Sequence, residues 1–470
     1  MTAQTILPAN TLSSGSYDVA NSVRLFSNTF LHKTPTGDSN KQVFTFSTWL
    51  KRGNITAEMG IFTAGNDSNR NGFFTVMFTD ADELNIQFYD GAFDDLKTNR
   101  KFRDVSAWYH IVVAVDTTDG TAANRIKVYV NGVQESSFAS SDYPDQNQNF
   151  DINEDANDVY VGVRRNSGGS PAGYYDGYIA EAVLIDGSQL AADQFGEFDS
   201  DSGIWKPIDV SGLTFGDNGF YLEFKETGTS QNASGIGADT SGNGNHVAVT
   251  NITATDISTD TCTNNFCVIN PLVNGTQTNS RNPTLSEGNT FLTNTSGAWM
   301  NCFSSFAVNS GKWYFEIKPT LHGTSYVHAG IYAVDDWQNE SSGWPNFGGA
   351  ANSWSYDSDG NIVNNDENED TNPDTYTTND IIGIAVDLDN NKFYAYKNNS
   401  LQISGGSTIT ANTEYYFGGM GYNSNIGFNF GNPPYANSSD AADAEGFGAF
   451  EFAPPSGFLA ICTKNLAGNS

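Results

Sequence analysis

The chain of 470 residues has few basic residues: 22 Lys and Arg stand against 54 Asp and Glu, and the formal net charge is −32. Non-specific nucleic-acid binding and adhesion to anionic membranes both depend on Lys and Arg, so this balance disfavours both kinds of partner. A strongly acidic surface favours solubility and suits a saline medium, where screening weakens self-repulsion. Solubility alone is the alternative to any specific role for this charge.

Long apolar runs and cysteines are also scarce. No apolar stretch approaches the roughly 18 residues of a membrane-spanning helix, so we expect no membrane insertion. The N-terminus, MTAQTILPANTLSSGS, lacks a basic start followed by an apolar core, so we expect no secretory signal. The four cysteines are too few for a disulfide framework and lack zinc-finger spacing. We expect ordinary thiols, with a bond between Cys262 and Cys267 as the alternative in an oxidising medium.

What the chain does contain is strand-forming residues separated by turns. Aromatic residues make up 13% of the chain, and Gly (47 residues), Asn and Asp interrupt short apolar runs. This pattern predicts an all-β protein with two antiparallel β-sandwich (jelly-roll-like) domains joined by a loop-rich bridge that packs on the first domain. The only helix that the pattern favours is short, over 188–198. The predicted divisions are an N-terminal arm (1–20), a first sandwich (21–205), the bridge (206–295) and a second sandwich (296–470).

Residues 108–134, WYHIVVAVDTTDGTAANRIKVYVNGVQ, illustrate the strand pattern. Alternating apolar residues predict two strands that face a sandwich core. Asn131 and Gly132 suit the positive φ angles of a tight turn. We therefore interpret this segment as scaffold, with Trp108 and Tyr109 as core or sheet-surface aromatics rather than ligand platforms.

Four motifs in the first predicted sandwich carry a family resemblance: FTFSTWLKRG (44–53), WYHIVVAVDTT (108–118), IKVYVNGV (126–133) and YDGYIAEAVLIDG (175–187). In this order they resemble the laminin-G and concanavalin A-like lectin superfamily, over roughly residues 20–190. The second sandwich resembles the SPRY family over roughly residues 296–466. Its motifs are GKWYFEI (311–317) and IIGIAVDLDNNKFYAYKNN (381–399).

The pairing of these domains, with FGEFDSDSGIWKP (195–207) and DTSGNGN (239–245) between them, is similar to bacteriophage virion proteins of the marine type. This resemblance implies a tail-fibre or adhesin protein on the virion surface, assembled in the host bacterial cytoplasm. Its partners would be other virion proteins and a host surface glycan or receptor, and it would form a homo-oligomer, with a trimer favoured. The alternative is a capsid decoration or head-fibre subunit without a receptor role. No heptad run is present, which favours a compact knob, decoration or short fibre.

The sequence offers little support for catalysis. It contains no G-x-S-x-G nucleophile motif, and its histidines lack metal-ligand spacing apart from the loose pair His322 and His328. Asp176 and Glu181 are the nearest approach to a glycosidase carboxylate pair. Their odd separation places them on opposite faces of a regular strand, although glycoside hydrolysis needs two carboxylates that flank one bond. We predict no catalytic residues and a protein that is not an enzyme.

A long acidic loop is predicted over 335–380. Its aromatic residues Trp337, Trp344, Trp354 and Tyr356 are the candidate ligand-binding residues, because flat rings stack on sugars or anchor a protein partner. The alternative is that they cover the domain's own core.

The segment DSDGN within this loop supplies a candidate calcium site. Asp357, Asp359 and Asn361 imitate the first half of a calcium loop, but no Glu closes it. Asp116 and Asp119 share another turn. Solvated, Asp-rich turns are the alternative at both places.

Overall fold

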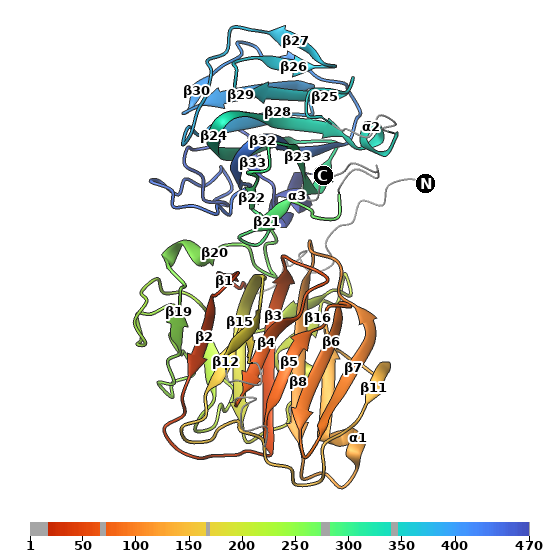
Figure 1. Ribbon diagram of the computed structural model, residues 1–470, viewed down its shortest axis with the longest axis vertical. Helices are drawn as coiled ribbons and strands as arrows, with labels where there is room; N and C mark the ends of the chain where they lie inside the picture. Colours follow the sequence, from red (N-terminus) through yellow and green to blue (C-terminus); the bar gives the residue numbers. More distant parts are fainter. Residues whose placement is uncertain (1–16, 66–71, 166–169, 274–282, 340–345, 470) are drawn as a thin grey trace. The chain divides into compact units, whose positions relative to one another are not determined.

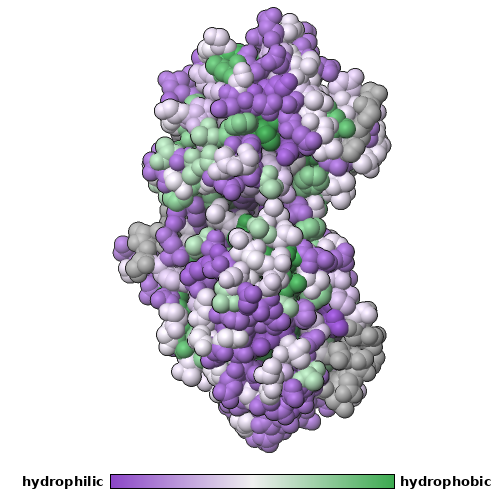
Figure 2. Space-filling model, turned by 90° about the vertical axis from the view of Figure 1, so that its left-hand side faces the viewer, coloured by the Kyte–Doolittle hydropathy of each residue, from purple (hydrophilic) through white to green (hydrophobic). Residues whose placement is uncertain are grey.

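The computed structural model describes residues 17–65, 72–165, 170–273, 283–339 and 346–469 (Figure 1). Strands dominate, so the all-β prediction is confirmed. The described chain divides into two compact units, 17–264 and 265–469, which we call the first and second units. Figure 2 shows one side of the molecule, where hydrophilic residues prevail and hydrophobic ones lie in small patches, as the charge of −32 leads one to expect.

The first unit is a sandwich of two antiparallel sheets. The strand order of one is β10-β9-β8-β3-β15-β1-β20, with β18 beside β15, and that of the other is β11-β7-β6-β5-β4-β12-β2-β19. The strands of the first sheet are β1 (Ser22–Leu25), β3 (Val43–Arg52), β8 (Trp108–Asp116), β9 (Ile126–Val130), β10 (Val133–Gln134), β15 (Gly177–Asp186), β18 (Phe220–Leu222) and β20 (Ile257–Ser258). Those of the second are β2 (Phe30–Lys33), β4 (Met59–Ala64), β5 (Phe74–Phe78), β6 (Glu83–Tyr89), β7 (Phe93–Lys101), β11 (Phe138–Ser141), β12 (Val159–Val161) and β19 (Ala248–Thr250).

Short elements complete this unit: α1 (Ala122–Arg125), β13 (Val163–Arg165), β14 (Pro171–Tyr174), the 3₁₀ turns η1 (Ala192–Gln194) and η2 (Ala254–Asp256), and the pair β16 (Gly196–Phe198) and β17 (Trp205–Pro207). The scaffold interpretation of 108–134 is confirmed: β8 pairs with both β3 and β9. Asn131 and Gly132 have φ angles of 47° and 77°. Trp108 is buried and Tyr109 packs against the core.

Two sequence expectations change in this unit. The helix predicted over 188–198 is wrong, because only η1 is helical and residues 196–198 form β16. Gly196 lets Trp205 pack closely, since a Cβ there would lie 2.6 Å from Trp205 Cζ2. The predicted bridge does pack on the first sandwich in part: β18, β19 and β20 are strands of its two sheets.

The second unit is built on β24 (Lys312–Ala333), which pairs antiparallel with β25, β28 and β32 and parallel with β33. The other strands are β21 (Thr284–Ser286), β22 (Phe291–Thr293), β23 (Trp299–Val308), β25 (Ser353–Asp357), β26 (Ile362–Asn364), β27 (Glu367–Asp370), β28 (Ile382–Asp387), β29 (Lys392–Lys397), β30 (Ser400–Leu401), β31 (Ser407–Thr408), β32 (Tyr415–Asn429) and β33 (Leu459–Ala460). Two helices, α2 (Val334–Asn339) and α3 (Thr463–Asn469), accompany them.

The loop predicted over 335–380 is wrong, because α2, β25, β26 and β27 lie within it. Because serines stand between the aromatic residues of β25, this strand was predicted as part of a polar loop. Ser353 Oγ donates to the Ile331 carbonyl (2.9 Å) and Ser355 Oγ to the Phe347 carbonyl (3.0 Å), so both hydroxyls are buried with satisfied hydrogen bonds.

Two simpler expectations concern thiols and membranes. All four cysteines are buried free thiols, which confirms the expectation of ordinary thiols. Within the described ranges, no helix is long and apolar enough to cross a membrane.

An ion pair in the first unit holds the segment after β20 against β3 and β8. Lys51 Nζ lies 2.8 Å from Asp260 Oδ2, and both side chains are at most 1% exposed. Trp108 Nε1 donates to the other carboxylate oxygen at 3.1 Å. A buried charge of this kind is tolerated only while it keeps its partner.

We expect Asp260→Asn to lower the free energy of unfolding by about 3–5 kcal/mol, because Lys51 is left buried without its counter-charge. Urea denaturation of the full chain measures this loss. Asp201→Asn, at an exposed position, is the matched control and should change stability by less than about 0.5 kcal/mol. Equal stability of the two variants would show that the buried pair does not hold this segment.

Candidate functional site

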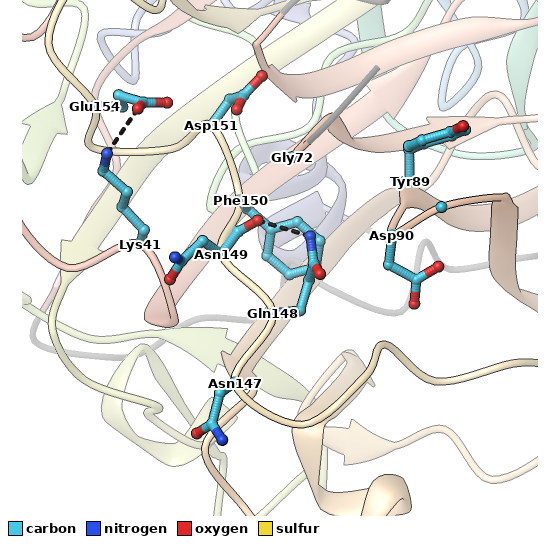
Figure 3. A pocket seen from close by; sticks show the side chains of 11 residues that line it. Lys41, Gly72, Tyr89, Asp90, Asn147, Gln148, Asn149, Phe150, Asp151 and Glu154 are labelled. Carbon is cyan, nitrogen blue, oxygen red and sulfur yellow. Dashed lines mark hydrogen bonds and ion pairs between the residues drawn. The ribbon is translucent and has the colours of Figure 1, made fainter. Parts of the chain in front are cut away.

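A polar cavity of about 450 Å³ lies at one end of the first sandwich. Four connections form it: the segment between β2 and β3, the one between β4 and β5, the turn after β6, and the long segment between β11 and β12. Figure 3 shows Lys41, Asp151 and Glu154 on one side, Tyr89 and Asp90 on the other. The amides of residues 147–149 lie along the same lining.

Backbone hydrogen bonds fix the segment 147–151. Asn147 N donates to the Thr117 carbonyl (2.8 Å), Phe150 N to the Lys41 carbonyl (3.0 Å) and Asp151 N to the Gly72 carbonyl (2.7 Å). The Phe150 ring is 1% exposed and belongs to the sandwich core. This anchor leaves the flanking amide side chains of Gln148 and Asn149 half-buried and exposed, respectively.

Two glycines make room for the Asp151 carboxylate. A Cβ at Gly65 would lie 2.5 Å from Asp151 Oδ2, and one at Gly72 would lie 2.3 Å from Oδ1. Both glycines have positive φ angles, 78° and 86°, which side chains rarely adopt. The Asp151 carboxylate therefore lies against two backbone positions at which a side chain would collide with it.

The charges in the cavity are unbalanced toward the acidic side. Lys41 Nζ pairs with Glu154 Oε1 at 2.7 Å and with Asp38 at 3.3 Å. Burial raises the pKa of Asp151 to about 7, and repulsion from Glu154 and a hydrogen bond with it add to the shift. A carboxyl group that titrates near neutrality can donate as well as accept hydrogen bonds.

The far wall supplies an aromatic surface. Tyr89 is half-buried and meets Phe93 edge-to-face with ring centroids 5.2 Å apart. Asp90 Oδ2 accepts from the Asp145 backbone N–H at 3.2 Å, which fixes the turn. Carboxylates, amides and a tyrosine around one cavity can bind a ligand rich in hydroxyl groups.

The residues predicted as ligand-binding lie elsewhere, in the second unit, and two of them are in its core. Trp354 is 4% exposed and Tyr356 is fully buried, so neither ring has a face available to a ligand. Trp337 is half-buried against Phe303 and Tyr416. Trp344 lies outside the described residues. The structure therefore gives Trp354 and Tyr356 the core role that was the alternative interpretation.

The predicted calcium ligands do not converge. Both carboxylate oxygens of Asp357 accept from Asn361, at 2.8 Å from its backbone N and 3.0 Å from its side chain, while Asp359 is exposed. Asp116 and Asp119 likewise accept from N–H groups in their own turns. Across the described ranges, no three His, Cys, Asp or Glu side chains group in a way that could hold a metal ion.

The other residues considered for chemistry are held by their neighbours. His110 lies between Ser47 Oγ (2.9 Å from Nε2) and Trp205 Nε1 (3.1 Å from Nδ1), and burial lowers the pKa of its ring to about 3. Glu181 accepts hydrogen bonds from the hydroxyls of Tyr221 (2.7 Å) and Tyr17 (3.1 Å). His110 therefore bonds locally.

Sequence analysis missed the cavity because its residues come from four connections that are far apart in the chain. One signal is visible in retrospect: Phe150 is the single large apolar residue in NQNFD (147–151). An isolated aromatic in a polar loop indicates an anchor, and the amides beside an anchor are held in place.

Comparison with protein families supports the two-domain assignment. The model of the concanavalin A-like lectin/glucanases superfamily matches residues 27–194, and the SPRY domain model matches residues 312–433. The chain thus contains a concanavalin A-like domain and a SPRY domain, both β-sandwiches, and the two family resemblances are confirmed. The comparison with curated proteins gave no match.

Similar solved structures include a putative carbohydrate binding protein from Bacteroides ovatus, with 16% identity and a TM-score of 0.34 over 50% of this chain. The chain spans only 58% of that protein. A pentraxin from Limulus polyphemus matches 38% of this chain and 82% of its own, with 16% identity and a TM-score of 0.28. The SPRY domain of human HERC1 matches 34% of this chain and 96% of its own, with 16% identity and a TM-score of 0.27.

Asp151 should make stability fall as the pH rises. Its pKa in the folded protein lies above the ordinary value, so the folded state holds the proton more tightly than the unfolded chain does. This contribution is complete below pH 3.8 and is lost as the pH rises toward about 7. We expect Asp151→Asn, which stays uncharged, to raise the melting temperature above pH 7 and to flatten its pH dependence below that.

Melting temperatures across this pH range measure the effect. Asp145→Asn changes an exposed position in the same connection. It should leave the dependence of melting temperature on pH as it is in the unmodified protein. If Asp151→Asn kept that slope too, the Asp151 carboxyl would not be the group that titrates near neutrality.

The core role of Trp354 gives a second prediction. Trp354→Ala should lower the free energy of unfolding by about 3–5 kcal/mol, because it leaves a cavity in the second unit. Leu401→Ala, at a position 47% exposed, should cost less than about 0.5 kcal/mol. Chemical denaturation compares the two, and a loss as small as that of the control would return Trp354 to the candidate ligand-binding residues.

Proposed function

We propose that the protein is a non-enzymatic adhesin that binds a host glycan in the cavity of its concanavalin A-like domain. The observation that supports this most strongly is the polar cavity of about 450 Å³. Backbone hydrogen bonds fix its segment 147–151, and two glycines make room for its Asp151 carboxyl group. Its volume lies within the range of small-ligand sites, about 300–1,000 Å³. Membership of this domain in a lectin-like superfamily supports the same role.

The lining favours an uncharged saccharide. Glu154 and Asp90 accept hydrogen bonds from sugar hydroxyls, and the amides of Gln148 and Asn149 both donate and accept. Lys41, the one basic residue among the described residues of the lining, is paired with Glu154 and Asp38. Three acidic side chains beside one paired lysine disfavour sialylated or other anionic sugars.

For the biological setting, we propose a bacteriophage virion surface, where the chain acts as a fibre or tail adhesin. The support is the resemblance of the domain pair and its connecting motifs to marine-type virion proteins. In that setting its partners are other virion proteins and the host receptor, and it assembles as a homo-oligomer, with a trimer favoured, in the bacterial cytoplasm. The absence of a heptad shaft in this sequence fits a short fibre as well as the second candidate, a capsid decoration or head-fibre subunit.

The test is binding of the purified full chain to intact candidate host cells and to their extracted polysaccharides, with neutral and sialylated oligosaccharides in parallel. We expect saturable binding to a neutral glycan, weakened at least about tenfold in the double variant Gln148→Ala/Asn149→Ala. Two lost hydrogen bonds of about 0.5–1.5 kcal/mol each account for that factor. Gln134→Ala, at an exposed position on β10, is the control and should bind normally.

Chelation of calcium during the same assay tests whether the ion takes part. Unchanged affinity in the double variant would remove the cavity as the binding site. Failure to bind any host fraction, together with incorporation into virions, would favour the decoration subunit.

A further inference from the structure

The second unit carries an aromatic row on the sheet face that turns away from its main core. Trp299 on β23 lies opposite Tyr422 on β32, and Tyr422 lies opposite Tyr326 on β24. Their ring centroids are 5.5 Å and 6.4 Å apart in these pairs, and Trp299 and Tyr326 converge to 6.1 Å with planes 28° apart. We call these three residues the aromatic row.

The alternation along β24 shows that the row is not needed for the main core. Val327 and Ile331 point into the core of the sandwich, whereas Tyr326, His328 and Tyr332 occupy the intervening positions. Tyr326 is 37% exposed, and Trp299 and Tyr422 are half-buried.

The same sheet face is closed farther along the strands. There Phe303 and Tyr332 pack against Phe347, at centroid distances of 5.1 Å and 5.9 Å, and Trp337 of α2 contacts Phe303 at 6.4 Å. This cover gives those rings a folding role. The aromatic row, at the other end, keeps exposed ring surface.

The three strand segments that carry the row are uncharged. Residues 294–303, 326–333 and 415–429 contain no Asp, Glu, Lys or Arg, in a chain whose net charge is −32. Burial lowers the pKa of His328 to about 4, so its ring is neutral as well. On the same face, Asp357 of β25 lies opposite His328, and its carboxylate accepts a hydrogen bond from the Asn361 backbone N–H.

A polar acceptor lies in the next register row. Asn301 stands beside Trp299 on the same face of β23, opposite Met420. Its Oδ1 is buried and has no hydrogen-bond partner among the described residues. A buried amide oxygen without a partner costs free energy, which a donor from a ligand would recover.

We propose that the aromatic row is a second ligand-binding site, which takes an uncharged saccharide. The apolar C–H faces of sugar rings stack on Trp299 and Tyr326, with the amide of the half-buried Asn301 in the next register row beside them. The uncharged strand segments of the row, with the Asp357 carboxylate beside them on the same face, favour a neutral, hydroxylated ligand over an anionic sugar. This site lies in the second unit and goes beyond the cavity of the concanavalin A-like domain, so one chain would have two glycan-binding sites.

The experiment uses the full chain labelled with 5-fluorotryptophan, with the Trp299 ¹⁹F resonance assigned from its loss in Trp299→Phe. The probes are neutral gluco-, manno- and malto-oligosaccharides, and an oligogalacturonate serves as the anionic comparison. We expect a saturable shift of the Trp299 resonance with a neutral probe and none with the anionic one. The Tyr326→Ala variant should weaken this response at least tenfold, whereas Tyr396→Ala, at a half-buried tyrosine of β29, should leave it unchanged.

The double variant Gln148→Ala/Asn149→Ala separates the two sites. The Trp299 response should persist in it, so loss of cavity binding and loss of row binding are distinguishable. A Trp299 resonance that none of the neutral probes moves would overturn the proposal. So would a Trp299 shift that depends on protein concentration alone and follows self-association in sedimentation, because a second copy of the chain would then cover the row.

Discussion

The structure depends on one constraint: a β-strand has two faces, and only one of them can point into a sandwich core. In the first unit, β8 directs Ile111 and Val113 inward, so Trp108 and His110 emerge on the opposite face. That face is buried as well, beneath the segments that follow β15 and β20, and this is why it holds polar groups with hydrogen-bond or ion-pair partners. The Lys51–Asp260 pair and the His110–Trp205 hydrogen bond are the result.

The second unit meets the same constraint with a shorter cover. Phe347 and Trp337 shield only one part of the outward face of β24, β32 and β23. Glycines at 330 and 418 let neighbouring strands approach: a Cβ at Gly330 would lie 2.0 Å from the Trp354 carbonyl oxygen, and one at Gly418 would lie 2.0 Å from that of Cys302. The rest of the face is left with aromatic rings and no charge. One part of this sheet face is therefore buried under Phe347 and Trp337, and the other part carries the aromatic row. Where the covering residues end determines which rings are available to a ligand.

Period-two alternation and turn residues were sufficient to predict the all-β class, the two sandwiches and the hairpin around β8. They failed where polar side chains are buried. Because of Ser353 and Ser355, β25 was predicted as part of a loop. Their hydroxyls donate to backbone carbonyls of residues that no local pattern identifies. The cavity was invisible for a related reason. Its geometry comes from backbone bonds between residues about as far apart as Asp151 and Gly72, which only the folded chain brings together.

Charge connects the two proposed sites to the rest of the chain. A net charge of −32 disfavours the approach of anions at low ionic strength, which weighs against anionic glycans at either proposed site. The cavity adds Asp90 and Glu154 to this selection, whereas the aromatic row lies on uncharged strand segments and would bind through its ring surface. Stacking on aromatics is insensitive to salt, and hydrogen bonding to carboxylates is only weakly screened in a partly buried cavity. Binding of a neutral polysaccharide through aromatic stacking and hydrogen bonds to carboxylates would therefore persist in a saline medium, which suits the acidic surface.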